Sequence, residues 1–508
     1  MDKKIRVRFA PSPTGGLHLG GVRTVLYNYL FAKQNGGDFI VRIEDTDQTR
    51  FVPGAEKYIF DCLEWCGLQP DESPVHGGEF GPYRQSERKP MYRDYAEQLI
   101  KNGFAYYAFD TPEELEKMRN DEKTAVNPSP QYDLKTRMRM KNSLSLSPDE
   151  LQQLLSSGAL HVIRIKMPVD ETISFNDLVH GEVNFESALV DDKVLLKADG
   201  MPTYHLAVVV DDFLMKITHA FRGEEWLSSA PVHILLWKHL FGLENMPQWA
   251  HLPLILGPSG KLSKRDGAKY GFPVFAMNWT DPKTNELLEG FKEKGFLPEA
   301  FINLLAVLGW NDGSGKEIYS LAELTEHFSI DRVHKAGAKF DFEKAKWFNH
   351  EWIKREPVSH FSLLVKEIFE SALIRISDEA YFNKVLELVK DRCTLISDFY
   401  EQAVYFFKAP AKWDTDAVKP KWNAAKSDFF IEYCAKLNGI EQWELAAIEA
   451  AFKVLATEKN IKPGELQLPM RIMLVGGKFG PAVFEIASLI GKEETISRIN
   501  KALTIFNQ

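Results

Sequence analysis

Near the amino terminus, a glycine-rich turn follows an alternating segment and precedes a helical pattern. Residues 8–21 read RFAPSPTGGLHLGG, and residues 5–9 alternate between apolar side chains and arginines. A strand, a turn and a helix in this order present backbone N–H groups and a positive dipole end at the start of the helix. His18 lies at that start with Gly20 beside it, so a phosphate could approach the backbone closely. An ordinary strand-to-helix turn with a capping histidine fits the same residues.

A second apolar segment brings a negative charge to the same region. Phe39–Ile43 is typical of a strand and leads into Glu44. Ligands of open parallel sheets gather beyond the carboxyl ends of the strands. Arg8 and Glu44 are therefore expected to face one crevice, where a positive and a negative group could bind a zwitterion. Either residue alone would usually be a solvated charge.

A basic loop, GPSGKLSKR, follows the apolar run Leu252–Leu256. It is not a Walker A motif, because Ile255 stands where that motif needs glycine and Leu262 where it needs serine or threonine. Lys261 and Lys264 are three residues apart, and two mobile lysines at this spacing can both reach one polyphosphate. A solvated surface loop is the alternative.

Two further stretches contain cations in patterns that suit RNA. Between residues 135 and 141 every second residue is a cation: Lys135, Arg137, Arg139 and Lys141. An extended segment would place all four on one face, as in an RNA contact or an edge strand protected by charge. Ala345–Arg355 mixes aromatic and basic residues, which suits base stacking with phosphate contact but also the core and rim of a helix.

Composition limits the class of protein. The 508 residues are too many for one compact core, and 44% hydrophobic and 26% charged residues are ordinary globular values. A net charge of −9 argues against a generally basic nucleic-acid coat, although not against a local basic groove. Four cysteines predict buried free thiols without a structural metal. No apolar signal core or membrane-spanning stretch is found, so a cytoplasmic protein is expected.

Several short apolar runs end in polar residues, which is typical of a doubly wound sheet. These runs include Leu206–Val210, Lys216–Phe221 and Leu252–Leu256. From about Pro298 onward the pattern is helical almost throughout, and the tail LPMRIMLVGGKFGPAVFEIASLIG predicts a helix, a glycine break and a helix. The expected fold is α/β: a Rossmann-like parallel sheet with an α+β insertion, followed by an all-α region.

Taken together, these stretches resemble the bacterial-type glutamate–tRNA ligases, a family of class I aminoacyl-tRNA synthetases. The matching motifs follow in order: RFAPSPTGGLHLGG, RIEDTD (42–47), GPYRQSER (81–88), DGMPTYHLA (199–207), THAFRGEEWL (218–227), HLPLILGPSGKLSKRDG (251–267), EAFINLLAVLGW (299–310), and the C-terminal LPMRIMLVGG and GPAVFE. Several would be weak singly, but their joint order is highly specific and covers essentially the whole chain.

The resemblance implies a domain plan. Residues 1–98 and 209–260 would form the Rossmann-like catalytic domain, and residues 99–208 an insertion that binds the tRNA acceptor end. Residues 261–340 would be a stem-contact domain carrying the KLSKR loop. Two helical subdomains, 341–410 and 411–508, would bind the anticodon.

The resemblance also implies residue roles. The glutamate pocket would contain Arg8, Ser12, Glu44, Tyr204 and Arg222. Both arginines would pair with the substrate carboxylates, and Glu44 with its ammonium group. The ATP site would contain His18, Gly20, Lys261 and Lys264, and of these His18, Lys261 and Lys264 would be catalytic, with Mg²⁺ accompanying the phosphates.

Two departures from the family pattern concern single positions, and one feature of some members is absent. Gly21 stands where the class signature has its second histidine, and Val208 stands where the family often has asparagine. The cysteine set that binds zinc in some members near residues 108–137 is absent, so no structural zinc is expected.

The implied activity has two steps, ATP-dependent glutamyl-adenylate formation with release of pyrophosphate and acyl transfer to the terminal ribose of tRNA(Glu). The implied partners are tRNA(Glu), L-glutamate and ATP, and a monomer is expected. A smaller adenylyl transferase would not need the helical half. Glutamine–tRNA ligases differ at both opening motifs, and a non-catalytic RNA-binding paralogue would be expected to have lost His18, Lys261 or Lys264. Whether tRNA(Gln) is also charged stays open.

Overall fold

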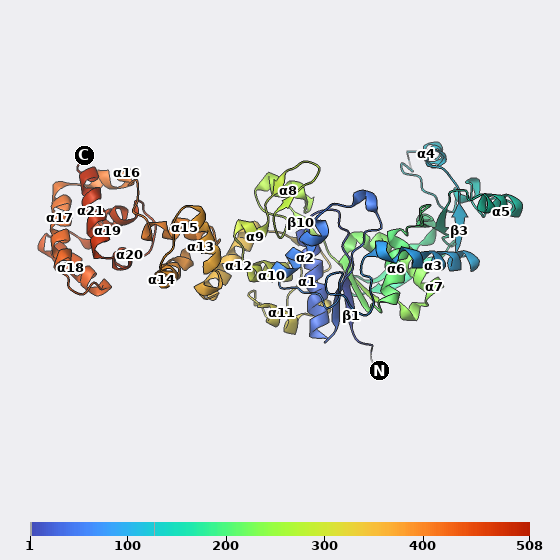
Figure 1. Cartoon of the computed structure of the whole chain (residues 1–508), viewed down its shortest axis with the longest axis horizontal. Coiled ribbons are helices and arrows are strands. Elements are labelled where there is room, and N and C mark those ends of the chain that lie inside the picture. Colours follow the sequence, from blue (N-terminus) through green and yellow to red (C-terminus); the bar gives the residue numbers. More distant parts are fainter. Residues whose placement is uncertain (1–2, 126) are drawn as a thin grey trace. The chain divides into compact units, whose positions relative to one another are not determined.

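The computed structural model describes residues 3–125 and 127–508, without the side chains of Lys264 and Arg265. The chain divides into two compact units (Figure 1). One comprises Met1–Glu293 and Phe301–Phe342, and the other comprises Lys294–Ala300 and Glu343–Gln508. No helix among the described residues is long and apolar enough to cross a membrane.

A six-stranded sheet, in the order β2-β1-β8-β9-β5-β6, forms the centre of the first unit. Its strands are β1 (Arg6–Phe9), β2 (Asp38–Val41), β5 (Thr172–Asp177), β6 (Gly181–Glu186), β8 (His219–Gly223) and β9 (Gln248–Leu252). Neighbours are parallel except for β5 and β6. The predicted α/β class with a mostly parallel sheet is confirmed. The hairpin β5–β6 lies within the range 99–208 and nevertheless joins this sheet.

The predicted strand, turn and helix at the amino terminus are present as β1 and α1 (Leu19–Gln34). β1 is buried along its whole length, because both faces of a parallel sheet are covered. α1 begins after His18, whose Nδ1 accepts a hydrogen bond from the N–H of Gly20 at 3.3 Å. It ends before Gly36, whose φ of +60° suits a residue without Cβ.

The prediction of a strand-like run at Leu206–Val210 is wrong, because these residues belong to helix α6 (Tyr204–Leu214). All five are at most 2% exposed, so apolar side chains face the core on every side and no periodicity separates strand from helix. The valines favour a strand locally, but packing against α3 (Lys89–Lys101) and α7 (Ala230–Leu240) decides for the helix. The two aspartates that follow are buried within α6.

The run Leu252–Leu256 lies across a boundary between strands. β9 ends at Leu252, and Pro253, which has no N–H for a sheet ladder, separates it from the next strand. A small sheet then contains β10 (Ile255–Gly257), β11 (Gly260–Lys261) and β14 (Ala338–Lys339). The KLSKR loop therefore begins on this hairpin and continues into α8 (Lys264–Tyr270).

A second small sheet, antiparallel in the order β3-β4-β7, lies within the range 99–208. Its strands are β3 (Ala105–Ala108), β4 (Val162–Ile165) and β7 (Val194–Leu196), and the helices between the first two are α4 (Pro112–Asp121) and α5 (Pro148–Ser156). The first unit also contains α2 (Ala55–Trp65), α9 (Phe291–Lys294), α10 (Pro298–Val307), α11 (Leu321–His327) and the hairpin β12 (Trp279–Thr280) with β13 (Leu287–Leu288), of which α9 and α10 are shared with the second unit.

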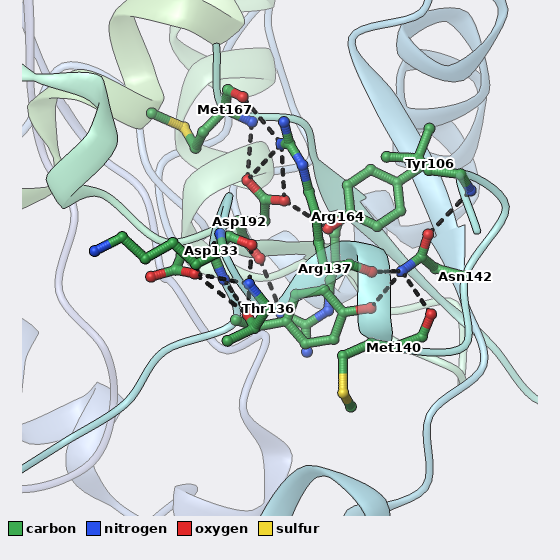
Figure 2. Close-up of polar contacts among 12 residues, drawn as sticks. Tyr106, Asp133, Thr136, Arg137, Met140, Asn142, Arg164, Met167 and Asp192 are labelled. Atoms are coloured by element: carbon green, nitrogen blue, oxygen red, sulfur yellow. Dashed lines mark hydrogen bonds and ion pairs between the residues drawn. The ribbon is translucent and has the colours of Figure 1, made fainter. Parts of the chain in front are cut away.

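The four alternating cations beside this sheet do not share one face, which corrects the extended-segment prediction. The N–H of Arg137 bonds to the carbonyl of Asp133, and Arg137–Arg139 forms a 3₁₀ turn. The side chain of Arg137 is buried against Asp192 (Figure 2), whereas Lys135 is exposed. The turn therefore divides the cations between core and solvent.

The second unit consists of helices, as predicted. Beyond α12 (Phe342–Arg355), whose first residue belongs to the first unit, they are α13 (Ser362–Ser371), α14 (Glu379–Val389), α15 (Asp398–Ala403), α16 (Thr415–Val418), α17 (Ala424–Asn438), α18 (Leu445–Glu458), α19 (Pro463–Val475), α20 (Val483–Ile490) and α21 (Lys492–Phe506). The predicted glycine break separates α19 from α20. All four cysteines of the chain are buried and unpaired, as predicted.

Candidate active site

A cavity of 660 Å³ lies beyond the carboxyl ends of β1 and β8. Its lining includes all but one of the predicted site residues: Arg8, Ser12, His18, Gly20, Glu44, Tyr204, Arg222 and Lys261. The exception is Lys264, whose side chain lies outside the described part of the chain. The carboxyl edge of the sheet thus brings together residues that are up to 253 positions apart in the chain, from Arg8 to Lys261.

Arg8 enters the cavity from the end of β1 and is anchored from behind by a carboxylate. Its Nε and Nη2 each donate to Asp212 of α6, at 3.1 Å. Asp212 also pairs with Nη1 of Arg42 at 2.8 Å. Burial opposes ionisation of Asp212, but the two arginines outweigh it and hold the pKa of this carboxyl below its usual range. Asp212 therefore fixes the orientation of Arg8 at the cavity wall.

Glu44 is a buried carboxyl at the same wall. Burial raises its pKa to about 7, although Arg42 and Arg8 act in the opposite direction. Its Oε1 lies 3.4 Å from Nη2 of Arg42, a long contact compared with the one between Arg42 and Asp212. The two arginines therefore offset only part of the cost of burying this charge, and a further cation in the cavity would complete the compensation.

Arg222, at the end of β8, is 6% exposed and has an incomplete set of hydrogen bonds. Its Nε and Nη1 donate to His251 and Tyr204 at 2.9 and 3.1 Å. Its Nη2 is buried without a hydrogen-bond partner among the described residues. Because an unpaired buried donor on a charged group is costly, this atom is a place for an acceptor supplied by a ligand.

His18 and Gly20 form the helix start on another side of the cavity. Because the N–H of Gly20 donates to Nδ1 of His18, the imidazole carries its proton on Nε2. A Cβ at Gly20 would meet only that Nδ1, at 3.9 Å, so the protein itself does not need glycine there. The space at Gly20 instead allows a ligand to approach the backbone at the positive end of α1.

Gly21 packs beside Leu17. A Cβ at this position would lie 2.7 Å from Cδ1 of Leu17, so a side chain here would require only a small shift of the flexible end of that leucine. Packing against Leu17 therefore does not explain the departure from the class signature at this position.

Lys261, on β11, is the part of the basic loop whose side chain is described. Its Nζ lies 3.2 Å from Oε1 of Glu225, and both side chains are well exposed, at 56% and 44%. Exposed pairs of this kind are weak and easily exchanged for another anion. Lys261 can therefore transfer from Glu225 to a phosphate.

Several residues of the site were missed by the sequence predictions. Asp212 and His233 had no predicted role, and His251 lies in the motif HLPLILGPSGKLSKRDG without a predicted role of its own. Trp226 lies beside Tyr204, with ring centroids 4.6 Å apart, and also lines the cavity. The only signals in the sequence for these missed residues were the polar residues after the run Lys216–Phe221 and those at the start of HLPLIL. Val208 is buried in α6 and is not part of the cavity lining.

A metal site in the protein would need several ligating side chains close together. Among the side chains that the structure describes, no three His, Cys, Asp or Glu are grouped so that they could hold a metal ion. ATP phosphates are themselves good ligands for Mg²⁺.

A parallel sheet whose carboxyl edge joins an HLGG helix start to a KLSKR loop, with a separate all-helical unit, defines a class I aminoacyl-tRNA synthetase. The family model described as tRNA synthetases class I (E and Q), catalytic domain, matches residues 4–347. A model described as anticodon binding domain matches residues 356–503. The chain belongs to the class I tRNA synthetases for glutamate and glutamine.

Relatives are similar over their whole length. The glutamate–tRNA ligases of Christiangramia forsetii and Flavobacterium psychrophilum are 49% and 50% identical to this chain, and each comparison covers 99% of both proteins. A crystal structure of a glutamate–tRNA ligase from Elizabethkingia meningosepticum, in complex with its amino acid, superimposes with a TM-score of 0.95 at 47% identity, covering 99% of this chain and 100% of that one. The resemblance found in the sequence is confirmed.

Proposed function

We propose that this chain is a glutamate–tRNA ligase that charges tRNA(Glu) with L-glutamate at the expense of ATP. The family membership and the full-length relatives support this activity. The observation that carries the assignment of the substrate is the buried Nη2 of Arg222, which has no partner among the described side chains and lies in the same cavity as Arg8 and Glu44. Two guanidinium groups and one carboxylate match the two carboxylates and the ammonium of glutamate.

In this proposal Arg8 and Arg222 each bind one carboxylate of the substrate, and Glu44 binds the ammonium. Ser12 and Tyr204 complete the pocket. Charge-assisted hydrogen bonds of this kind contribute about 1.5–3 kcal/mol each when the site excludes water.

ATP occupies the remaining part of the cavity. Gly20 and the N-terminus of α1 contact phosphate, His18 donates through its Nε2–H, and Lys261 and Lys264 bind the polyphosphate from the basic loop. Mg²⁺ would be held mainly by the phosphate oxygens and would neutralise their charge. The residues present fit this arrangement, because the open space at Gly20 and the exchangeable Lys261 both face the cavity.

The first step forms one bond and breaks one. A glutamate α-carboxylate oxygen attacks the α-phosphorus of ATP, and the bond from that phosphorus to the bridging oxygen breaks as pyrophosphate leaves. In the second step a hydroxyl of the terminal ribose of tRNA attacks the activated carbonyl, and AMP leaves. No nucleophile from the protein is needed, so catalysis rests on positioning and on cations near the developing phosphate charge.

The tRNA is expected to contact both units. We infer that the insertion within residues 99–208 holds the acceptor end, that residues 261–340 contact the stem, and that the helices of 341–410 and 411–508 bind the anticodon. The anticodon-binding family match supports the last of these.

Pyrophosphate exchange and aminoacylation test the proposal. Purified chain should aminoacylate tRNA(Glu) with glutamate in preference to glutamine or aspartate, and failure to charge any tRNA with glutamate would overturn the proposal. Lys264→Ala should lower single-turnover activation by about 10²–10³-fold with tRNA binding nearly intact. Unchanged activation would remove Lys264 from the catalytic set. Side-by-side charging of tRNA(Gln) defines the tRNA scope.

A further inference from the structure

Two histidine rings hold the guanidinium of Arg222. Its Nε–H donates to Nε2 of His251 at 2.9 Å, and Nη1 donates to Nδ1 of His233 at 3.2 Å. Both rings are fully or almost fully buried. Arginine can only donate hydrogen bonds, so both ring nitrogens accept, and both imidazoles are neutral.

The proton order continues outward from both rings. His251 must carry its proton on Nδ1, which donates to Oδ2 of Asp177 at 2.6 Å. His233 must carry its proton on Nε2, which donates to Nδ1 of His205 at 3.1 Å. Burial lowers the pKa of His251 and of His205 to about 4, and that of His233 well below its usual value, in agreement with neutral rings near pH 7.

The result is a buried arginine whose position is fixed while its charge stays available. No carboxylate among the described residues forms an ion pair with Arg222, although Asp177 lies one ring away behind His251. The other contacts of Arg222 are also uncharged: the hydroxyl of Tyr204, 3.1 Å from Nη1, and the ring of Trp249, 4.9 Å from the guanidinium carbon. Arg8, in contrast, gives two of its nitrogens to a carboxylate, Asp212.

We propose that His233 and His251 are positioning residues for the amino acid substrate: as neutral acceptors they orient Arg222 and leave its positive charge for a substrate carboxylate. This inference rests on the proposed function and extends it. A substrate with a neutral amide in place of the side-chain carboxylate would leave the buried charge of Arg222 uncompensated. The two neutral histidines therefore make the pocket select glutamate over glutamine.

A matched pair of variants at His233 separates charge from shape. In His233→Gln the amide oxygen can accept from Arg222 and the amide nitrogen can donate to His205. In His233→Glu the shape is nearly the same, but a carboxylate neutralises Arg222. In glutamate-dependent pyrophosphate exchange we expect the Gln variant to stay within about 3-fold of the parent KM for glutamate. We expect the Glu variant to raise that KM by about 10–100-fold and to lose a similar factor of preference over glutamine, with the KM for ATP unchanged in both.

Asp177→Asn tests the role of His251. It also keeps the inference testable if His233→Glu does not fold. Oδ1 of Asp177 accepts from the backbone N–H groups of Val179 and His180, so the asparagine would keep its oxygen there and point its NH₂ at His251. His251 would then have to accept on Nδ1 and carry its proton on Nε2, so that its Nε2–H would face the Nε–H of Arg222. The KM for glutamate should rise about 10-fold, while the KM for ATP stays constant.

Two results would overturn the inference: equal effects of the Gln and Glu variants at His233, or an unchanged KM for glutamate in Asp177→Asn. Failure of the unmodified chain to charge any tRNA with glutamate is a different outcome, because it removes the proposed function itself.

Discussion

The segment of residues 99–208 around the sheet β3-β4-β7, which is the expected insertion, and the cavity beyond β8, which is the expected substrate crevice, each bury an arginine. The two arginines are satisfied in opposite ways. In the insertion, Nη1 of Arg137 lies 3.2 Å from Asp192 and 3.0 Å from the carbonyl of Met167 (Figure 2). In the crevice, Arg222 has uncharged acceptors and one nitrogen with no partner in the part of the chain that the structure describes. Full compensation makes the first arginine part of the fold, whereas incomplete compensation leaves the second ready for a ligand.

The network around Asp192 shows how complete the compensation in the insertion is. Its carboxylate also accepts from the hydroxyl of Tyr106 at 2.6 Å and from the N–H of Met167 at 2.9 Å. The backbone carbonyl of Asp192 accepts from Nη1 of Arg164 at 2.9 Å. These contacts tie β3, through Tyr106, and β4, through Arg164, to the segment containing Arg137, so the network stabilises the packing of that segment.

Removing Arg137 should cause the largest loss of stability. Arg137→Leu leaves the carboxylate of Asp192 buried without its cation, which costs about 3–5 kcal/mol in the free energy of unfolding. Urea denaturation followed by fluorescence measures this, and the KM for glutamate of the remaining folded protein should stay the same. Lys135→Met, an exposed cation in the same segment, is the control and should change little. Equal stability of the two variants would contradict a structural role for the pair.

Removing the charge of Arg222 should have the opposite effect, a large loss of glutamate activation with a smaller loss of stability. Arg222→Gln loses two charge-assisted hydrogen bonds to the substrate and should lower kcat/KM for glutamate by about 10²–10⁴-fold. The destabilisation should be smaller than for Arg137→Leu, because no carboxylate loses its partner. Steady-state pyrophosphate exchange and urea denaturation on the same preparations measure both quantities. A large loss of stability with normal glutamate activation would make the two arginines equivalent.

The protonation of Glu44 should make glutamate binding in the crevice depend on pH. Its pKa of about 7 in the free protein means that the carboxyl must lose a proton before it can bind the substrate ammonium. The KM for glutamate should therefore be constant above pH 7. Below pH 7 it should increase, approaching a 10-fold increase for each unit by which the pH falls, while Glu44→Gln should have a high KM that does not depend on pH in this range. The same raised pKa gives a contribution to stability that is present below about pH 4.5 and is lost as the pH rises through 7. A pH-independent KM between pH 5.5 and 8 would argue against the ammonium contact.

The exposed pair between Glu225 and Lys261 should give the smallest effect. Glu225→Gln frees Lys261 for phosphate and should lower the KM for ATP by about 2-fold at low salt. The difference should disappear at high ionic strength, because the contact is solvent-exposed. Steady-state titrations of ATP at two salt concentrations measure this. A rise in the KM for ATP instead would mean that Glu225 helps to bind ATP.

Motifs in the sequence predicted those candidate site residues that have the other residues of their motif beside them in the chain. The turn at residues 8–21 contains its strand, glycines and helix start within one short segment, so local chemistry sufficed to predict it. The ordered motifs identified the family, and the helical half followed from its periodicity. The break at Gly476 could also be predicted, because glycine is favoured in the left-handed conformation that ends α19, where φ is +88°.

The surroundings of those residues come from contacts between segments that are distant in the chain. The strand-like run at Leu206–Val210 became a helix because a fully buried segment has no periodicity to reveal its type. Arg137 became buried because Asp192, 55 positions away, needs its charge. The neutral histidines at Arg222 come from α7 and β9, and no spacing in the chain links them. Charge compensation depends on contacts between distant segments, and for that reason the sequence could identify the arginines of this protein but not which of them remains available for a ligand.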